Sequence, residues 1–134
     1  MNAFLIDLDD KPGELARVTE AIAAKGIDLT GVAGAPTGGH GVVALITNDE
    51  AGTRSVLAAG GFRVREVEVV PAAIEARPGG LAVVARRLAD AGVNIAAAFA
   101  TGMSGDRITV AIATPDGAAA RAALGDAAVT AAAR

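Results

Sequence analysis

Residues 10–15, DKPGEL, return in similar form as ARPGGL at residues 76–81. The segment GIDL at residues 26–29 returns as GVNI at residues 92–95, at the same offset along the chain. Similarity between segments at one fixed offset indicates a repeated structural unit. The two predicted copies are residues 1–70 and residues 71–134.

Each copy has the pattern of a strand, a helix, two strands, a second helix and a last strand. In the first copy, apolar runs and turn residues predict these elements over residues 4–8, 12–26, 27–33, 42–47, 50–59 and 62–70. A glycine-rich loop over residues 34–41 is predicted between the middle strands. The last strand of the second copy, residues 127–132, is predicted from a weak alanine-rich pattern. The order βαββαβ is the ferredoxin-like arrangement, an antiparallel sheet with both helices on one face, so the predicted fold class is α+β.

Two of the predicted strands are unusually apolar. Residues 41–47 and 109–114 are apolar at nearly every position instead of alternating with polar residues. A strand of this kind is usually buried on both faces. Because the helices of this arrangement cover only one face of the sheet, we expect a second chain to cover the other.

The residue content argues against catalysis. The chain has no cysteine and a single histidine, His40, in the predicted loop, where we expect it to be exposed. A Ser-His-Asp triad would need His40 with Ser55 or Ser104, and neither serine lies in a nucleophile-type turn sequence. The sequence therefore predicts no catalytic residue, no metal site and no cofactor, and a protein that is not an enzyme.

Charge and hydropathy argue against two classes of partner, nucleic acids and membranes. The net charge is −3, there is no Tyr or Trp, and no basic run exceeds Arg86-Arg87, so we expect no nucleic-acid binding. No apolar run approaches the roughly 18 to 20 residues of a membrane span. The first residues, MNAFLIDLDDKPG, carry acids where a signal peptide has basic residues. We therefore expect a cytoplasmic protein with no membrane partner.

The turn before the first helix is the place where the residues predict binding. Pro12-Gly13 opens this helix, so the free N–H groups of Gly13, Glu14 and Leu15 give the turn a partial positive charge. Such a turn suits a carboxylate, and Asp10 could accept the ammonium group of the same ligand. The two charges match an amino acid zwitterion. An alternative is that Asp10 only caps the helix, as short acidic side chains often do.

The DKPGEL turn, the following helix and GIDL, together with the second copy ending in GVNI, resemble the ACT domain. This resemblance covers nearly the whole chain and weakens after about Gly125. ACT domains are small regulatory modules on enzymes of amino acid metabolism, and they also occur as stand-alone tandem pairs. The resemblance implies two units packed side by side through the first helix and second strand. It also implies that amino acids bind where the turn of one unit faces the second strand of its neighbour.

The resemblance assigns ligand positions to this chain. One site combines the turn of the first copy with the start of the second strand of the second copy. Its positions are Asp10, Lys11, Pro12, Gly13, Glu14, Leu15, Asn94 and Ile95. For the reciprocal pairing, which is the weaker second site, they are Ala76, Gly79, Gly80, Leu81, Asp28 and Leu29.

These two sets of positions are not equivalent. Asp10 with Asn94 offers a carboxylate and an amide, whereas Ala76 lacks a turn side chain and Asp28 places an acid where the family commonly has an amide. The sequence therefore predicts one competent site and one degenerate site. An alternative is that Asn94 and Asp28 only form turns or caps after the preceding glycines.

The leading hypothesis is a non-catalytic regulatory protein that binds a free amino acid between ACT units. We expect a homodimer or a higher homo-oligomer, and an enzyme of amino acid metabolism is a candidate partner. The alternative is a ligand-free interaction or assembly module, or a regulatory subunit of such an enzyme.

Overall fold

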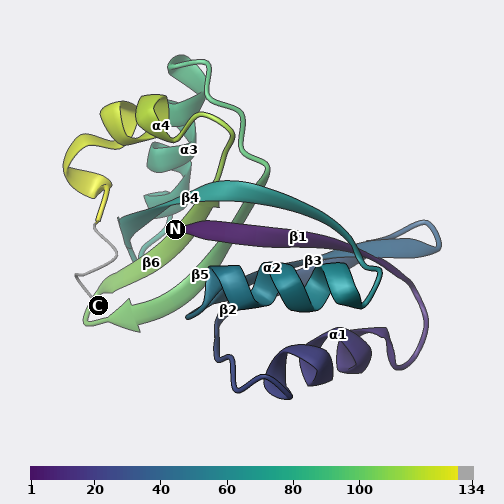
Figure 1. The fold of residues 1–134 in the computed structure, drawn as a ribbon. Helices are drawn as coiled ribbons and strands as arrows, with labels where there is room; N and C mark the ends of the chain where they lie inside the picture. The colour runs from purple at the N-terminus through teal and green to yellow at the C-terminus, as the bar shows by residue number, and fades with distance from the viewer. Residues whose placement is uncertain (130–134) are drawn as a thin grey trace. The chain divides into compact units, whose positions relative to one another are not determined.

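The structure, a computed structural model, describes residues 1–129 (Figure 1). It divides the chain into two compact units. The first unit is Asn2–Glu66, and the second unit is Met1 together with the residues from Val67 onward.

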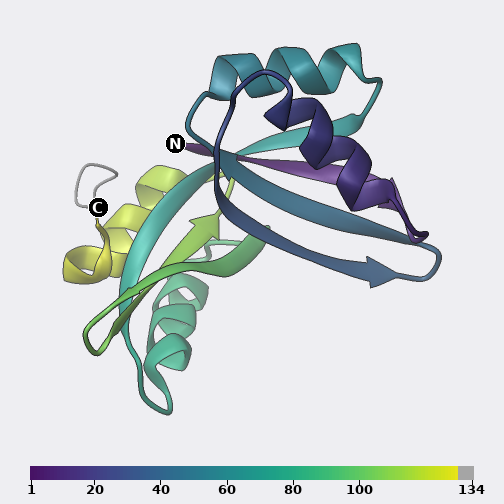
Figure 2. The ribbon, with the colours of Figure 1, turned by 90° about the horizontal axis from the view of Figure 1, so that it is seen from below.

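The first unit is a four-stranded sheet with two helices. It contains β1 (Asn2–Asp9), α1 (Glu14–Ala23), β2 (Leu29–Thr37), β3 (His40–Thr47), α2 (Glu50–Ala59) and the beginning of β4 (Arg63–Glu75). Its strands follow the order β2-β3-β1-β4, with β3 antiparallel to both β1 and β2. The helices α1 and α2 lie on one face of this sheet (Figure 2). The core on that face consists of Phe4, Ile6, Leu8, Val18, Ile22, Ile27, Leu45 and Leu57.

The second unit repeats this plan. It contains the rest of β4, α3 (Gly80–Asp90), β5 (Ala97–Ser104), β6 (Arg107–Ala113), α4 (Gly117–Leu124) and the 3-10 helix η1 (Gly125–Ala127). Its strands follow the order β4-β6-β5 and are antiparallel. Its core consists of Val70, Ala72, Ile74, Val84, Leu88, Val93, Val110, Ile112, Ala120 and Leu124. The predicted α+β class, with repeated βαββαβ units, is confirmed.

The end of the second unit differs from the strand predicted over residues 127–132. Residues 125–127 form η1, and Ala128 forms only an isolated bridge with Ala72. The remainder of the predicted strand, residues 130–132, lies outside the described residues. The prediction is therefore wrong for Ala127, where a helical turn replaces the start of the strand.

The predicted loop over residues 34–41 is also wrong. The strands β2 and β3 run through most of it, and only Gly38 and Gly39 form the turn of the hairpin. Both glycines have positive φ angles, 64° and 92°, which is the backbone of a two-residue hairpin turn that glycine enters without steric cost. The glycine-rich composition thus reflects a tight turn and close strand packing. His40 is exposed beside this turn, as predicted.

Strand β4 does not end at residue 70 as predicted but continues to Glu75. Pro71 lies inside this strand, opposite Ala111 of β6. The carbonyl of Pro71 accepts a hydrogen bond from the N–H of Val129 at 2.9 Å, so the backbone of Pro71 faces away from β6. The missing N–H of proline is therefore not needed by the β4–β6 ladder, which is the position where strands tolerate proline.

The two apolar runs are buried at their C-terminal halves. Residues 44–47 of β3 and residues 110–113 of β6 are buried at every position, which confirms burial on both faces there. That a second chain covers the other face stays a prediction. The first half of β3 remains partly exposed, with Val42 at 40%.

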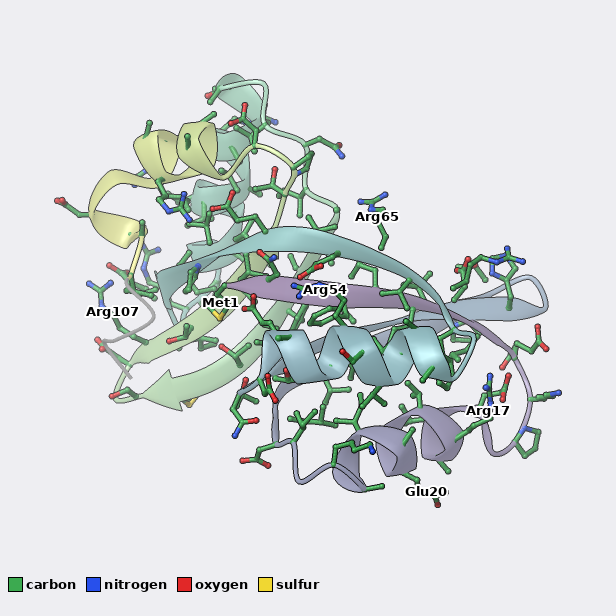
Figure 3. The ribbon with its side chains drawn as sticks, in the orientation of Figure 1. Met1, Arg17, Glu20, Arg54, Arg65 and Arg107 are labelled. Carbon is green, nitrogen blue, oxygen red and sulfur yellow. The ribbon has the colours of Figure 1, made fainter. Side chains whose placement is uncertain are left out.

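Glu66 of β4 is held by side chains from two other elements of the first unit. Arg54 of α2 donates two hydrogen bonds to its carboxylate, at 2.9 and 2.5 Å, and Asn2 Nδ2 donates a third at 3.0 Å (Figure 3). These donors, Arg54 above all, lower the pKa of the Glu66 carboxyl to about 2. The charged form of Glu66 therefore contributes to the stability of the first unit.

We expect Glu66→Gln to lower the free energy of unfolding at neutral pH, because the amide loses the charge that Arg54 contacts. The pKa of Glu66 is depressed in the folded chain from 4.5 to about 2, so the stabilisation is present above about pH 4.5 and is lost as the pH falls toward 2. The difference between wild type and E66Q in urea unfolding should therefore be constant near neutral pH and narrow below pH 4.5.

The matched control is Glu20→Gln, because Glu20 is an exposed residue of α1 with no ion pair among residues 1–129 (Figure 3). This variant should stay within about 0.5 kcal/mol of wild type throughout. A difference for E66Q that remains unchanged at pH 3 would contradict the role assigned to Glu66.

Candidate functional site

A hollow of about 250 Å³ lies at the turn between β1 and α1 in the first unit. We call it the first hollow. Its rim comes from the turn and the first residues of α1, and its floor comes from the hairpin of β2 and β3. The lining residues are Leu8, Asp9, Asp10, Lys11, Glu14, Leu15, Val32, Gly34, Ala35, Pro36, Gly41, Val42 and Val43.

The backbone of the turn fixes the rim of the first hollow. The N–H of Asp10 donates to the carbonyl of Gly39 at 3.0 Å, which ties the turn to the end of the β2–β3 hairpin. Gly13 then takes a φ of 91°, a left-handed conformation that starts α1, and no side chain caps this helix. The alternative that Asp10 caps α1 is therefore wrong. The amides of Gly13, Glu14 and Leu15 donate no hydrogen bond within residues 1–129.

The charged side chains of the rim are mostly engaged with one another. Glu14 accepts a hydrogen bond from Arg17 Nε at 2.9 Å, and this bond lowers the pKa of Glu14. The Arg17 guanidinium in turn lies 4.3 Å from the ring centroid of Phe62 (Figure 3). Lys11 Nζ lies 3.9 Å from the Asp9 carboxylate. Asp10 is exposed and has no side-chain hydrogen bond within residues 1–129, so its carboxylate is available to a ligand.

The floor of the first hollow is apolar and uncovered in the single chain. Val32 of β2 is 54% exposed, and Leu15 at the start of α1 is 50% exposed. Gly41 packs so closely on β2 that a β-carbon there would lie 2.9 Å from the carbonyl oxygen of Ala35. The small residues of this hairpin therefore bring its two strands together beneath the hollow. The sequence did not identify this floor, because residues 34–41 were expected to form a loop.

A second hollow, of about 600 Å³, lies at the equivalent turn between β4 and α3. Its lining residues are Ile74, Glu75, Ala76, Arg77, Leu81, Ala98, Phe99, Ala100, Ile108 and Val110. The backbone of the turn repeats that of the first unit: the N–H of Ala76 donates to the carbonyl of Asp106 at 2.8 Å, and Gly79 has a φ of 88°. The two hollows thus have the same scaffold.

The start of α3 differs from the start of α1. The N–H of Gly80 donates to the carbonyl of Arg77 at 3.0 Å, whereas the N–H of Glu14 has no such acceptor within residues 1–129. Gly80 also approaches the Glu75 carbonyl so closely that a β-carbon there would collide with it. The Glu75 side chain pairs with Arg77, which lowers the pKa of Glu75. This turn therefore offers a ligand fewer free groups.

Asp28 and Asn94 lie away from the turns of their own units. In the first unit Asp9 pairs with His40 while Leu29 pairs with Thr47, so the turn and Asp28 lie at opposite ends of β3. Both residues are exposed, and the hydrogen bonds that they form within residues 1–129 are made by their backbone groups. The predicted pairings of Asp10 with Asn94 and of Ala76 with Asp28 join different copies, and they stay predictions.

Residues 1–129 show neither a metal-ion cluster nor a membrane-spanning helix. No three His, Asp or Glu side chains in this range are grouped so that they could hold a metal ion. No helix of the range combines the length and the apolar character that a membrane span needs.

One protein-family model matches the chain, within the first unit. Residues 3–59 match the family model described as ACT domain. No curated relative matches the chain significantly by sequence.

Solved structures resemble the chain over nearly its whole length. The protein BT0572 from Bacteroides thetaiotaomicron is 26% identical with a TM-score of 0.77, over 93% of this chain and 86% of that one. The regulatory subunit of aspartate kinase from Thermus thermophilus in its ligand-free form is 22% identical with a TM-score of 0.67, over 94% and 90%. A putative C-terminal regulatory domain of aspartate kinase from Porphyromonas gingivalis is 16% identical with a TM-score of 0.56, over 96% and 93%. The fold of both copies is therefore shared with known proteins.

The contact between Gly80 and Glu75 leads to a prediction. Replacing glycine by alanine in a helix usually stabilises it by up to about 1 kcal/mol. At Gly80 we expect the opposite, a loss of about 1–3 kcal/mol in urea unfolding, because the new β-carbon must push α3 away from β4.

Glu14→Ala is the matched control, because residue 14 occupies the equivalent position in α1 and already carries a side chain. It removes an ion pair with Arg17, whose side chain is 51% exposed, and should cost about 1 kcal/mol, at the lower end of the loss expected for G80A. If G80A proved as stable as wild type, the close packing at the start of α3 would be refuted.

Proposed function

We propose that this chain is a non-catalytic regulatory module that binds a free amino acid, because residues 3–59 match the ACT domain family model. The first hollow is the observation that carries the proposal. Its volume of about 250 Å³ lies below the roughly 300–1,000 Å³ of pockets for drug-sized ligands, which suits a single small metabolite.

Each part of an amino acid has a complementary group at the first hollow. The free amides at the start of α1 suit the carboxylate, since unpaired N–H groups and the helix dipole favour negative charge. The uncommitted carboxylate of Asp10 suits the ammonium group. The apolar floor with Val32 and Val42 suits an apolar side chain.

We propose that Asn94 and Ile95 of a neighbouring copy complete this site, in the same chain or in another one. The first hollow is open on the side of Val32 and Leu15, so a second surface is needed to enclose a ligand. The second hollow, which Ala76 and Leu81 line and Gly79 and Gly80 do not, is the weaker site, because the N–H of Gly80 is already bonded and Glu75 is already paired.

We propose that amino acid binding to this chain regulates an enzyme. The chain resembles proteins described as regulatory subunits or regulatory domains of aspartate kinase, and most of their length is covered. We propose that the chain likewise acts on an enzyme of amino acid metabolism, as a homodimer or a higher homo-oligomer. A ligand regulates such an assembly only through different affinities for its states.

A pure interaction module is the second candidate. The observation that favours it is the exposure of Leu15 and Val32 side by side with the acids of the turn. In that case the floor of the first hollow is the surface that contacts a partner protein, and the contact forms without an amino acid ligand.

The test is a thermal unfolding panel with each of the twenty amino acids, followed by calorimetric titration of any that bind. A ligand at about 100 times its dissociation constant adds roughly 2.7 kcal/mol, and it should raise the melting temperature by several degrees. Asp10→Ala should abolish this rise, because it removes the group for the ammonium.

The control is Asp28→Ala, which makes the same change in an acid of the weaker site and should leave binding largely intact. Equal losses in both variants would contradict the assignment of one competent site. A flat panel with wild type would favour the interaction module.

A further inference from the structure

A third hollow, of about 220 Å³, lies in the second unit on the other side of the start of α3. We call it the arginine hollow, because it receives residues Arg77, Arg87 and Arg107 from three different elements. Arg77 belongs to the turn before α3 and Arg87 to the last turn of α3. Arg107, labelled in Figure 3, belongs to the start of β6. Ile74, Val83 and Val84 provide apolar walls.

The internal repeat shows which side chains stand at the corresponding place in the first unit. In the first unit the corresponding place is filled by Glu14, Arg17 and Phe62, with Arg17 bonded to Glu14 and stacked on the Phe62 ring. At the positions equivalent to Glu14 and Arg17, the second unit has Gly80 and Val83. The smaller side chains open the space that the first unit fills.

The same repeat shows that Arg87 and Arg107 have no arginine counterpart in the first unit. Arg87 stands where the first unit has Ala21, and Arg107 stands where it has His40. Two positions that are neutral in the first unit thus carry guanidinium groups in the second. The copies also differ in total charge, with ten acids and six bases in residues 1–70 but five acids and six bases in residues 71–134.

The charges around the arginine hollow leave cationic donors free. Glu75 pairs with Arg77, and Arg107 faces Glu75 across the β4–β6 ladder. Arg87 donates from Nη1 to the carbonyl of Leu124 at 3.2 Å, and its other N–H groups form no hydrogen bond within residues 1–129. Asp126 is the second acid of the lining, so three guanidinium groups face two carboxylates.

We propose that the arginine hollow binds a phosphate group, either inorganic phosphate or a phosphate monoester. A guanidinium presents a planar fork of N–H donors that matches the oxygens of a phosphate, and it is charged at every physiological pH. Donors from three elements surround a tetrahedral dianion better than they surround a planar carboxylate. This site is separate from the first hollow and does not depend on amino acid binding.

The test is calorimetric titration of the whole chain with inorganic phosphate, at ionic strength held constant with sodium chloride. We expect saturable binding to wild type and at least tenfold weaker binding to Arg107→Gln, which removes one guanidinium at an exposed position. The matched control is Arg86→Gln on α3, because Arg86 pairs with Asp90 and does not line the hollow. R86Q should bind phosphate as wild type does.

A second titration with glycerol 3-phosphate distinguishes the two sources of the phosphate group. Tighter binding of glycerol 3-phosphate than of inorganic phosphate supports a metabolite as the ligand, and equal binding supports the phosphate group alone. The proposal is overturned if wild type binds neither probe, or if R107Q and R86Q bind them equally well. Failure here leaves the amino acid panel and its Asp10 dependence unaffected, so the two proposals can fail separately.

Discussion

One backbone hydrogen bond in each unit positions everything that surrounds the turn. In the first unit the N–H of Asp10, just after the first strand, donates to the carbonyl of Gly39 in the turn of the hairpin. In the second unit the N–H of Ala76 donates in the same way to the carbonyl of Asp106. This bond fixes where the chain leaves the sheet, and a left-handed glycine, Gly13 or Gly79, then turns it into the helix. The helix start and the hairpin floor therefore face each other at a fixed place. Both hollows at the turns result from this constraint.

The two copies show how much chemistry can change on an unchanged backbone. The helices α2 and α4 begin alike, with Asp49 and Asp116 accepting hydrogen bonds from the backbone three residues later. The surroundings of the turns have nevertheless diverged, because the first unit keeps a free acid and an engaged Arg17 while the second has Gly80 and added arginines. Backbone hydrogen bonds preserve the fold, so side chains at the turn were free to vary.

The sequence predicted the features that depend on local pattern. Helix α2 has the bounds expected from its periodicity, and the βαββαβ order followed from the repeat. The predictions for residues 34–41 and for the end of β4 were wrong. The glycines of residues 34–41 allow two strands to pack closely, so they do not break the strands. Pro71 does not end β4, because its backbone lies on the side away from β6, where the ladder needs no N–H group. It located Asp10 and the turn amides but not the apolar floor from Val32 to Val43. That floor depends on the register of β2 against β3, which composition does not specify.

The continuity of strand β4 affects how the two copies can evolve. The strand runs without interruption from Arg63 to Glu75, while the boundary between the two compact units falls after Glu66. The boundary therefore falls within a strand, whereas most neighbouring domains are joined by exposed segments with few contacts. Recombination at that boundary would cut through a hydrogen-bonded strand. The two halves are thus expected to evolve as an inseparable pair, each free to specialise because the other is always present.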